Sequence, residues 1–215
     1  MTKTRTLPAT LPLFPLPGCI LLPGEILPLN VFEPRYLNMV DDARREGGHI
    51  GIIQPQTNRA THQPSGQPPL RRVGTAGHIK SFVETRDGRY LLTLDGICRF
   101  TLDAETDAAA PYRTGRVDYT RYVSDLVPRP PLAGNRPRLI ALLRAWLGGE
   151  PIQLDWTGVD AMPLEALVDR LAMLAPMPAE ARQGLLEAPD SAARLARFES
   201  LITTLIAGRA SGTVQ

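Results

Sequence analysis

The sequence predicts an α+β fold in which an antiparallel, β-rich domain comes first and a helical bundle follows. Two observations carry this prediction. Up to about residue 124, apolar residues occur in short runs separated by Pro, Gly and Asp-Gly, which is the pattern of short strands joined by turns. Beyond residue 137 the apolar residues recur every three or four positions, which is the period of helices that pack on one face.

The boundary between the two patterns is a proline-rich stretch, DLVPRPPLAGNRP, at residues 125–137, which we interpret as a linker. The β-rich domain then covers residues 11–124, and the helical domain covers residues 138–209. Residues 1–10 are polar and are predicted to form a flexible tail. A chain of 215 residues with 43% hydrophobic residues can bury a core, as one domain or as two small ones.

The first strands are predicted in LPLFPLPGCILLPGEILPLNVFEPRY, residues 11–36, an apolar segment interrupted by proline and glycine. Proline fixes φ and cannot donate a backbone hydrogen bond, so no long helix fits here. Residues 11–16 and 26–31 instead suit short strands with proline at an end or at an edge. Pro34 suits the first position of a helix, which is predicted to run to about residue 46 and to stop at two glycines.

Residues 49–54 form the next predicted strand, and residues 55–69 form a polar surface loop that is longer than most connections. Two β-hairpins are then predicted around Asp87-Gly88 and Asp95-Gly96, because Asp-Gly favours the tight turn that joins antiparallel strands. In the second hairpin, alternation places Cys98, Phe100 and Leu102 on one face and Arg99 and Thr101 on the other. Residues 112–119 add one more strand.

Four helices are predicted after the linker. The first carries Leu139, Leu142, Leu143 and Trp146 on one face. Pro163 and Pro178 suit the starts of the second and third helices, and Asp190 suits the cap of the fourth. The predicted inward stripes are Leu164, Leu167, Val168, Leu171 and Leu174 in the second helix, and Leu195, Phe198, Leu201, Ile202 and Leu205 in the fourth.

The segment LPLFPLPGCILLPGEILPLNVFEPRYLNMV resembles the opening of the Lon protease N-terminal, substrate-binding domain, in which L-P-L-F-P-L precedes L-P-G and then L-P-L-x-I-F-E-x-R-Y. The segments VGTAGHI, DGRYLLTLDGICRF and PYRTGRVDY and the helical region continue the resemblance over about residues 10–207. It is weakest in residues 125–160. Thr75 stands where the family more often has Cys, and we expect a packing change there. The resemblance implies a PUA-like pseudo-barrel followed by a helical bundle.

Larger members of that family also carry an ATPase module and a Ser-Lys peptidase domain, and this chain is expected to be a stand-alone short form without them. A P-loop needs a Gly-Lys pair, and neither Lys3 nor Lys80 follows glycine. Lys80 adjoins Ser81, but consecutive strand residues face opposite sides, so no catalytic dyad is expected. The histidines lack ligand spacing and the cysteines form no Cys-x-x-Cys, so neither a metal nor another cofactor is expected.

The two cysteines, Cys19 and Cys98, are interpreted as reduced core thiols of a cytoplasmic protein. The sequence LPGC at residues 16–19 faintly resembles a lipoprotein cleavage site, but prolines interrupt the apolar segment before it. No apolar run approaches the roughly 20 residues that a membrane-spanning helix needs, so no membrane partner is expected.

The motif FEPRY, residues 32–36, supports two interpretations. In the structural one, Phe32 packs under the helix, Glu33 favours the positive N-terminus of the helix, and the following residues tie it to the sheet. In the functional one, Phe14 and Phe32 are apolar anchors for an unfolded polypeptide and Arg35 donates to a backbone carbonyl, with Tyr36 in the same candidate site. An open sheet edge beside this segment could also accept an extended peptide as an added strand.

The leading hypothesis is a non-enzymatic module that binds unfolded polypeptides or a partner protein and serves as an adaptor for proteolysis or protein quality control. The alternative is an RNA-binding PUA-like protein that uses the basic residues Arg71, Arg72, Lys80, Arg86, Arg89 and Arg99. Interleaved acidic residues, a net charge of +2 and 6% aromatic residues do not favour nucleic acid. A hydrolase, the third hypothesis, lacks a nucleophile–base pair.

Overall fold

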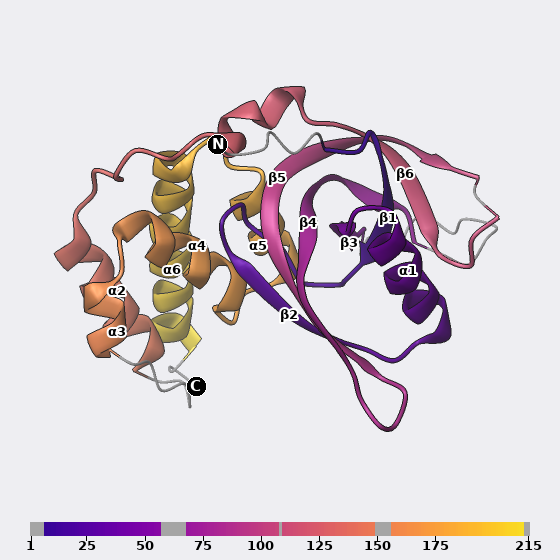
Figure 1. Cartoon of the computed structure of the whole chain (residues 1–215). Coiled ribbons are helices and arrows are strands. Elements are labelled where there is room, and N and C mark those ends of the chain that lie inside the picture. The colour runs from indigo at the N-terminus through magenta and orange to yellow at the C-terminus, as the bar shows by residue number, and fades with distance from the viewer. Residues whose placement is uncertain (1–6, 57–67, 108, 149–155, 213–215) are drawn as a thin grey trace. The chain divides into compact units, whose positions relative to one another are not determined.

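A computed structural model describes residues 7–56, 68–107, 109–148 and 156–212 of the chain (Figure 1). The chain divides into two compact units, Met1–Pro128 and Arg129–Gln215, and each is described by itself. The first unit is built mainly of strands and the second of helices, so the predicted α+β class with the β-rich part first is confirmed.

The first unit is a six-stranded sheet that closes into a ring. Its strands are β1 (Thr10–Pro15), β2 (Ile26–Val31), β3 (His49–Pro55), β4 (Leu70–Glu84), β5 (Tyr90–Thr106) and β6 (Arg113–Asp118), with helix α1 (Pro34–Arg45) after β2 and the 3₁₀ segment η1 (Thr120–Leu126) after β6. The strand order is β2-β5-β4-β3-β1-β6, and pairing of β6 with β5 closes the ring. All pairs are antiparallel except β1–β3, which is parallel. The closed ring confirms the pseudo-barrel that the family resemblance implies.

Strand β5 is long enough to hold two different partners along one of its edges. Residues Tyr90–Asp95 pair with β2, and residues Thr101–Thr106 pair with β6, whereas β4 runs along the opposite edge. The ring therefore closes through the second half of β5, and β2 lies at the end of the sheet. Within the described residues, β2 has a strand partner on one side only.

The core of the barrel surrounds Phe100, whose side chain is fully buried. Its apolar cluster comprises Leu11, Leu13, Ile53, Leu70, Ala76, Phe100, Leu102 and Val117. The predicted inward face of Cys98, Phe100 and Leu102 is confirmed, because all three are buried. Gly74 makes room for the ring, since a Cβ atom at that position would lie 2.6 Å from Phe100 Cζ.

The predicted hairpin at Asp95-Gly96 is wrong, because both residues lie inside β5. The β4–β5 register shifts between Ala76 and Gly77, so the strand continues through an irregularity in place of a turn. Tertiary contact overrides the local turn signal here. The Gly96 N–H donates to the Glu25 carbonyl (2.9 Å), and a Cβ atom on Gly96 would lie 2.2 Å from the Leu22 carbonyl oxygen.

We expect Gly96→Ala to lower the free energy of unfolding of the barrel by about 2–3 kcal/mol, because backbone must move to admit the methyl group. Urea unfolding followed by tyrosine near-ultraviolet circular dichroism measures this loss. Gly184→Ala, followed by tryptophan fluorescence of the helical unit, is the control, because no described atom beyond its chain neighbours and its own helix backbone lies within 4 Å of a Cβ atom there. A Gly96→Ala protein as stable as the wild type would contradict the close approach described above.

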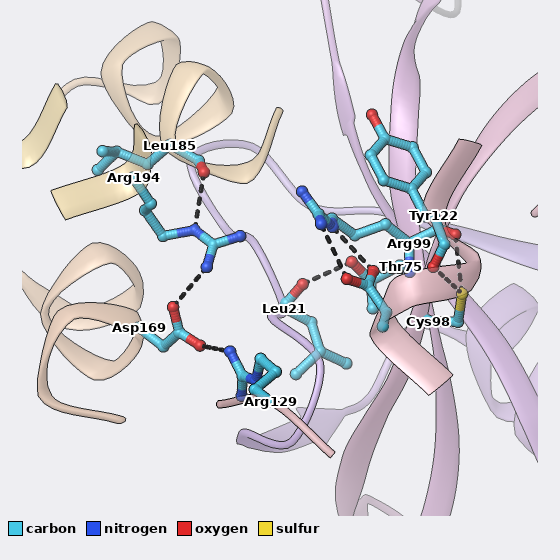
Figure 2. A network of polar contacts seen from close by, with 10 residues as sticks. Leu21, Thr75, Cys98, Arg99, Tyr122, Arg129, Asp169, Leu185 and Arg194 are labelled. Atoms are coloured by element: carbon cyan, nitrogen blue, oxygen red, sulfur yellow. Dashed lines mark hydrogen bonds and ion pairs between the residues drawn. The ribbon is translucent and has the colours of Figure 1, made fainter. Parts of the chain in front are cut away.

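Thr75, at the position where the family resemblance favours Cys, is fully buried and forms a hydrogen bond. Its hydroxyl donates to the Leu21 carbonyl oxygen at 2.5 Å (Figure 2). Leu21 lies between the buried residues Ile20 and Leu22 in the irregular segment that connects β1 with β2. The Thr75 side chain therefore fills core space, and its hydroxyl also connects this segment to β4 through a hydrogen bond.

The second unit contains helices α2 (Arg136–Leu147), α3 (Trp156–Ala161), α4 (Leu164–Leu174), α5 (Ala179–Leu186) and α6 (Ser191–Gly212). Helix α6 packs against α2, α4 and α5 (Figure 1). The start signals are confirmed, because Pro163 and Pro178 occupy the N-caps of α4 and α5. Asp190 precedes α6 and accepts a hydrogen bond from the Ala193 N–H at 2.7 Å.

Three features differ from the prediction for this half of the chain. Helix α3 was not predicted, and neither was η1, which begins after the predicted last strand and ends two residues into the predicted linker. Leu174, expected to face inward, has 71% of its surface exposed. Leu174 is the last residue of α4. The 3.6-residue period of a helix allows either residue 174 or residue 175 to face inward, and Ala175 is the one that is buried.

Candidate functional site

The predicted site residues Phe14, Phe32, Arg35 and Tyr36 all line one pocket of about 460 Å³ in the barrel unit. Other residues of the pocket wall include Pro15, Pro17, Asn30, Pro55, Pro68 and Arg113. Most of the wall is therefore apolar or proline. Part of the predicted loop 55–69, residues 57–67, lies outside the described residues.

Local sequence explains how the N-terminal segment reaches this pocket. Phe14 lies near the end of β1, whereas Phe32 directly follows β2. Pro34 then starts α1, with Glu33 at the N-cap, and the Tyr36 N–H donates to the Glu33 carbonyl at 2.9 Å. Strand, turn and helix start thus follow one another closely enough to place the ends of β1 and β2 and the first turn of α1 around the same cavity.

The pocket has a buried aromatic floor and an exposed aromatic rim. The rings of Phe14 and Tyr36 are 4.3 Å apart between centroids, and both residues are buried. Phe32 has 64% of its surface exposed, so the interpretation that it packs under the helix is wrong. Burial raises the pKa of Tyr36, partly opposed by the charge of Arg35, so the phenol is neutral at physiological pH.

The charged groups of the pocket are paired locally. Arg35 Nε donates to Glu33 Oε2 at 2.9 Å, and its guanidinium lies 4.5 Å from the centroid of the Tyr36 ring. Arg113 Nε donates to Glu105 Oε2 at 2.6 Å, and its Nη1 donates to the Pro68 carbonyl at 2.8 Å. Among the described residues that line the pocket, the two ion pairs leave no charged group without a partner, which favours apolar over charged ligand groups.

Sequence reasoning missed Arg113 and Asn30. Arg113 reaches the pocket because it pairs with Leu13 across the β1–β6 ladder, next to Phe14. Asn30 reaches it from β2, where its exposed side chain stands at the rim. No local signal marks Arg113. It lies 98 positions after Pro15, which lines the same pocket, and only the closing of the ring brings the two residues together. Asn is uncommon in strands, so the sequence alone could have marked Asn30 as a candidate site residue.

Several of the basic residues considered for RNA binding are already engaged. Arg99, predicted to lie on the face opposite Cys98 and Phe100, is 2% exposed and is bound to Asp125 at 2.8 Å, because η1 covers that face of β5. Lys80 forms an ion pair with Asp95 at 3.2 Å, and Arg89 forms one with Asp87. Arg99 therefore offers no contact to a phosphate group.

Two further findings bear on the kind of site this is. Among the residues that the structure describes, no three or more His, Cys, Asp or Glu side chains are grouped as metal ligands. In the same part of the chain, no helix combines the length and apolar character needed to cross a membrane.

Barrels of this kind followed by helices occur in solved structures. The Lon N-terminal domain protein from Xanthomonas campestris superimposes with a TM-score of 0.61 at 25% identity, over 89% of this chain and 97% of that one. The N-terminal domain of Mycobacterium avium complex Lon protease shares the fold, with a TM-score of 0.60 at 17% identity over 92% of this chain and 98% of that one.

The family profile of the ATP-dependent protease La (LON) substrate-binding domain matches residues 10–204, and the chain belongs to this family. Among related proteins, Lon protease of Anaeromyxobacter dehalogenans is 27% identical over 91% of this chain and 23% of its own length. Lon protease 2 of Myxococcus xanthus is 27% identical over 91% of this chain and 24% of its own length. This chain thus spans about a quarter of the length of those proteins.

Proposed function

We propose that the barrel unit binds unfolded polypeptides by taking one large apolar side chain into the pocket between Phe32 and the buried rings of Phe14 and Tyr36. The observation that carries this proposal is the pocket itself, whose volume of about 460 Å³ exceeds that of any single side chain. Its aromatic floor, exposed aromatic rim and paired charges suit an apolar group presented by an extended chain. Membership of a substrate-binding family supports the same function.

In this proposal the protein binds without catalysing a reaction. It acts in the bacterial cytoplasm as an adaptor that presents polypeptides to a separate protease or quality-control partner. The relatives are named Lon proteases, and the family to which this chain belongs is the substrate-binding domain of such proteases, which supports a link to proteolysis. A folded client hides its large apolar side chains, so the adaptor would select unfolded chains.

Fluorescence anisotropy with a labelled polypeptide tests the proposal directly. The probe is one protein in two forms, folded and permanently unfolded by reduction and carboxymethylation. We expect micromolar binding of the unfolded form and at least tenfold weaker binding of the folded form. Because the charged groups described in the pocket are paired, binding should change little between 50 and 200 mM salt. Equal binding of both forms, or a steep loss with salt, would contradict this function.

We expect Phe32→Ala to weaken binding of the unfolded polypeptide about tenfold while leaving stability almost unchanged. Truncation removes an aromatic surface that the ligand would cover, but Phe32 makes little contact with the core because it is 64% exposed. Anisotropy measures the affinity, and thermal unfolding checks the fold. Val123→Ala is the matched control, since Val123 is 58% exposed in the same unit and does not line the pocket. Similar losses in both variants would argue against the pocket.

A further inference from the structure

Within the described residues, strand β2 has one edge without a strand partner, and the hydrogen-bonding pattern of its ladder with β5 shows which residues lie on that edge. The Gly96 N–H donates to the Glu25 carbonyl just before β2 begins. In an antiparallel ladder, alternate residues share the hydrogen-bonding direction, so the main-chain groups of Leu27, Leu29 and Val31 face β5. Those of Ile26, Pro28 and Asn30 therefore face away from β5, toward the edge without a strand partner in the described residues.

The position of Pro28, in the middle of this edge, agrees with this hydrogen-bonding pattern. Pro28 has no N–H, so it is tolerated in a strand where its nitrogen faces the open side. The edge then offers N–H donors at Ile26 and Asn30 and carbonyl acceptors at all three positions. From Ile26 to Asn30 the edge extends over about 13 Å, which matches five residues of an extended strand.

The surface around this edge is apolar. Ile26 and Phe32 are 45% and 64% exposed. Leu91 pairs with Asn30 across the ladder, Val83 pairs with Leu91, and both are exposed. Exposed apolar groups beside an unpaired strand are typical of an interaction surface.

The edge also leads directly to the pocket. Asn30, at the end of the open edge, lines the pocket together with Val31 and Phe32. A strand added beside β2 would therefore run past the pocket mouth, and alternate side chains of that strand would point toward the face that carries Phe32.

We propose that β2 accepts an extended segment of an unfolded polypeptide as an additional strand, and that this strand delivers an apolar side chain to the pocket. This inference rests on the function proposed above and adds main-chain recognition to it. Main-chain bonds are independent of side-chain identity, so the edge would hold clients of unrelated sequence while the pocket selects their apolar residues.

Pro28 favours such a client over a second copy of this chain. If two β2 edges paired with each other, each would contribute a position without an N–H donor, and the short ladder would lose bonds on both strands. A client segment without proline supplies every donor on its own side. Proline on an edge strand is a common protection against pairing between identical copies.

Backbone N-methylation separates strand addition from side-chain binding. The probe is a labelled nine-residue peptide of alternating Thr and Val with one central Phe. Two derivatives carry three N-methyl groups on alternate residues, in one phase or the other. In an added strand only one set of N–H groups faces β2, so one derivative should bind at least tenfold more weakly than the parent peptide. The other derivative should stay within about twofold of it.

The amides of the protein provide a second readout. Hydrogen exchange measured by NMR should slow at least tenfold at Ile26 and Asn30 when the parent peptide binds, with little change at the already paired Leu27. Equal affinity of both methylated peptides, with Phe32→Ala still weakening binding, would overturn strand addition and leave the pocket proposal intact. Absence of binding by the parent peptide and by unfolded polypeptide would overturn both.

Pro28→Thr tests the role of the missing donor. The substitution adds one N–H to the open edge, and we expect about fivefold tighter binding of the parent peptide, the gain typical of one net hydrogen bond. Unchanged or weaker binding by a Pro28→Thr protein of wild-type stability would contradict the proposed geometry.

Discussion

Replacing Asp169 with alanine should lower the free energy of unfolding of the helical unit by about 3–5 kcal/mol, the cost of leaving a buried charge without its partner. Asp169 on α4 is fully buried and lies between two arginines (Figure 2). Its Oδ1 accepts a hydrogen bond from Arg194 Nη1 at 2.7 Å, and its other oxygen binds Arg129. Arg194, itself 2% exposed, also donates from Nε to the Leu185 carbonyl at 3.0 Å.

Urea unfolding followed by tryptophan fluorescence measures this loss. Both tryptophans of the sequence, Trp146 and Trp156, lie in the helical unit and report on it alone. Arg129→Ala should cost less, because Arg129 is partly exposed and water can replace it. The double substitution Asp169→Leu with Arg194→Met should recover much of the loss, since it removes both buried charges. A loss below about 1 kcal/mol in Asp169→Ala would contradict the network.

Asp125→Ala should destabilise the barrel unit by a similar amount, about 3–5 kcal/mol. Asp125 lies in η1 and accepts three hydrogen bonds from Arg99 of β5, from the backbone N–H at 3.0 Å and from Nε and Nη2 at 2.8 Å each. Arg99 cannot turn outward without opening the packing between β5 and η1. The substitution would therefore leave a buried guanidinium with an unmet charge and release η1 from the barrel.

Tyrosine near-ultraviolet circular dichroism during urea unfolding follows the barrel, and the thiol of Cys98 reports on the release of η1. Cys98 donates to the Tyr122 carbonyl of η1 at 3.3 Å, and burial raises its pKa to about 12, so it should resist thiol reagents at pH 8 (Figure 2). Faster labelling of Cys98 is expected in Asp125→Ala. The double substitution Arg99→Met with Asp125→Leu is the control and should recover stability. Slow labelling and full stability of Asp125→Ala would show that the pair is dispensable.

The sequence alone determined those elements whose signals are local. Proline and glycine spacing in residues 11–36 fixed the two short strands, and Pro34, Pro163, Pro178 and Asp190 marked helix starts, because caps and φ restrictions act over a few residues. The predicted pocket residues Phe14, Phe32, Arg35 and Tyr36 also come from one continuous segment. They could be grouped because strand, turn and helix start follow each other directly.

Tertiary structure alone decided the features that depend on distant partners. Asp95-Gly96 carries the signal of a turn, but the main chain near Leu22 and Glu25 packs against it and holds it in a continuous strand. The alternation of side chains along β5 places Arg99 on the face opposite Cys98. Only the tertiary structure shows that η1 covers this face and supplies Asp125 as a partner. Arg113 enters the pocket, and β2 keeps one edge without a strand partner among the described residues, because of the order in which the strands close the ring. Strand order depends on long-range pairing, which local residue patterns do not encode.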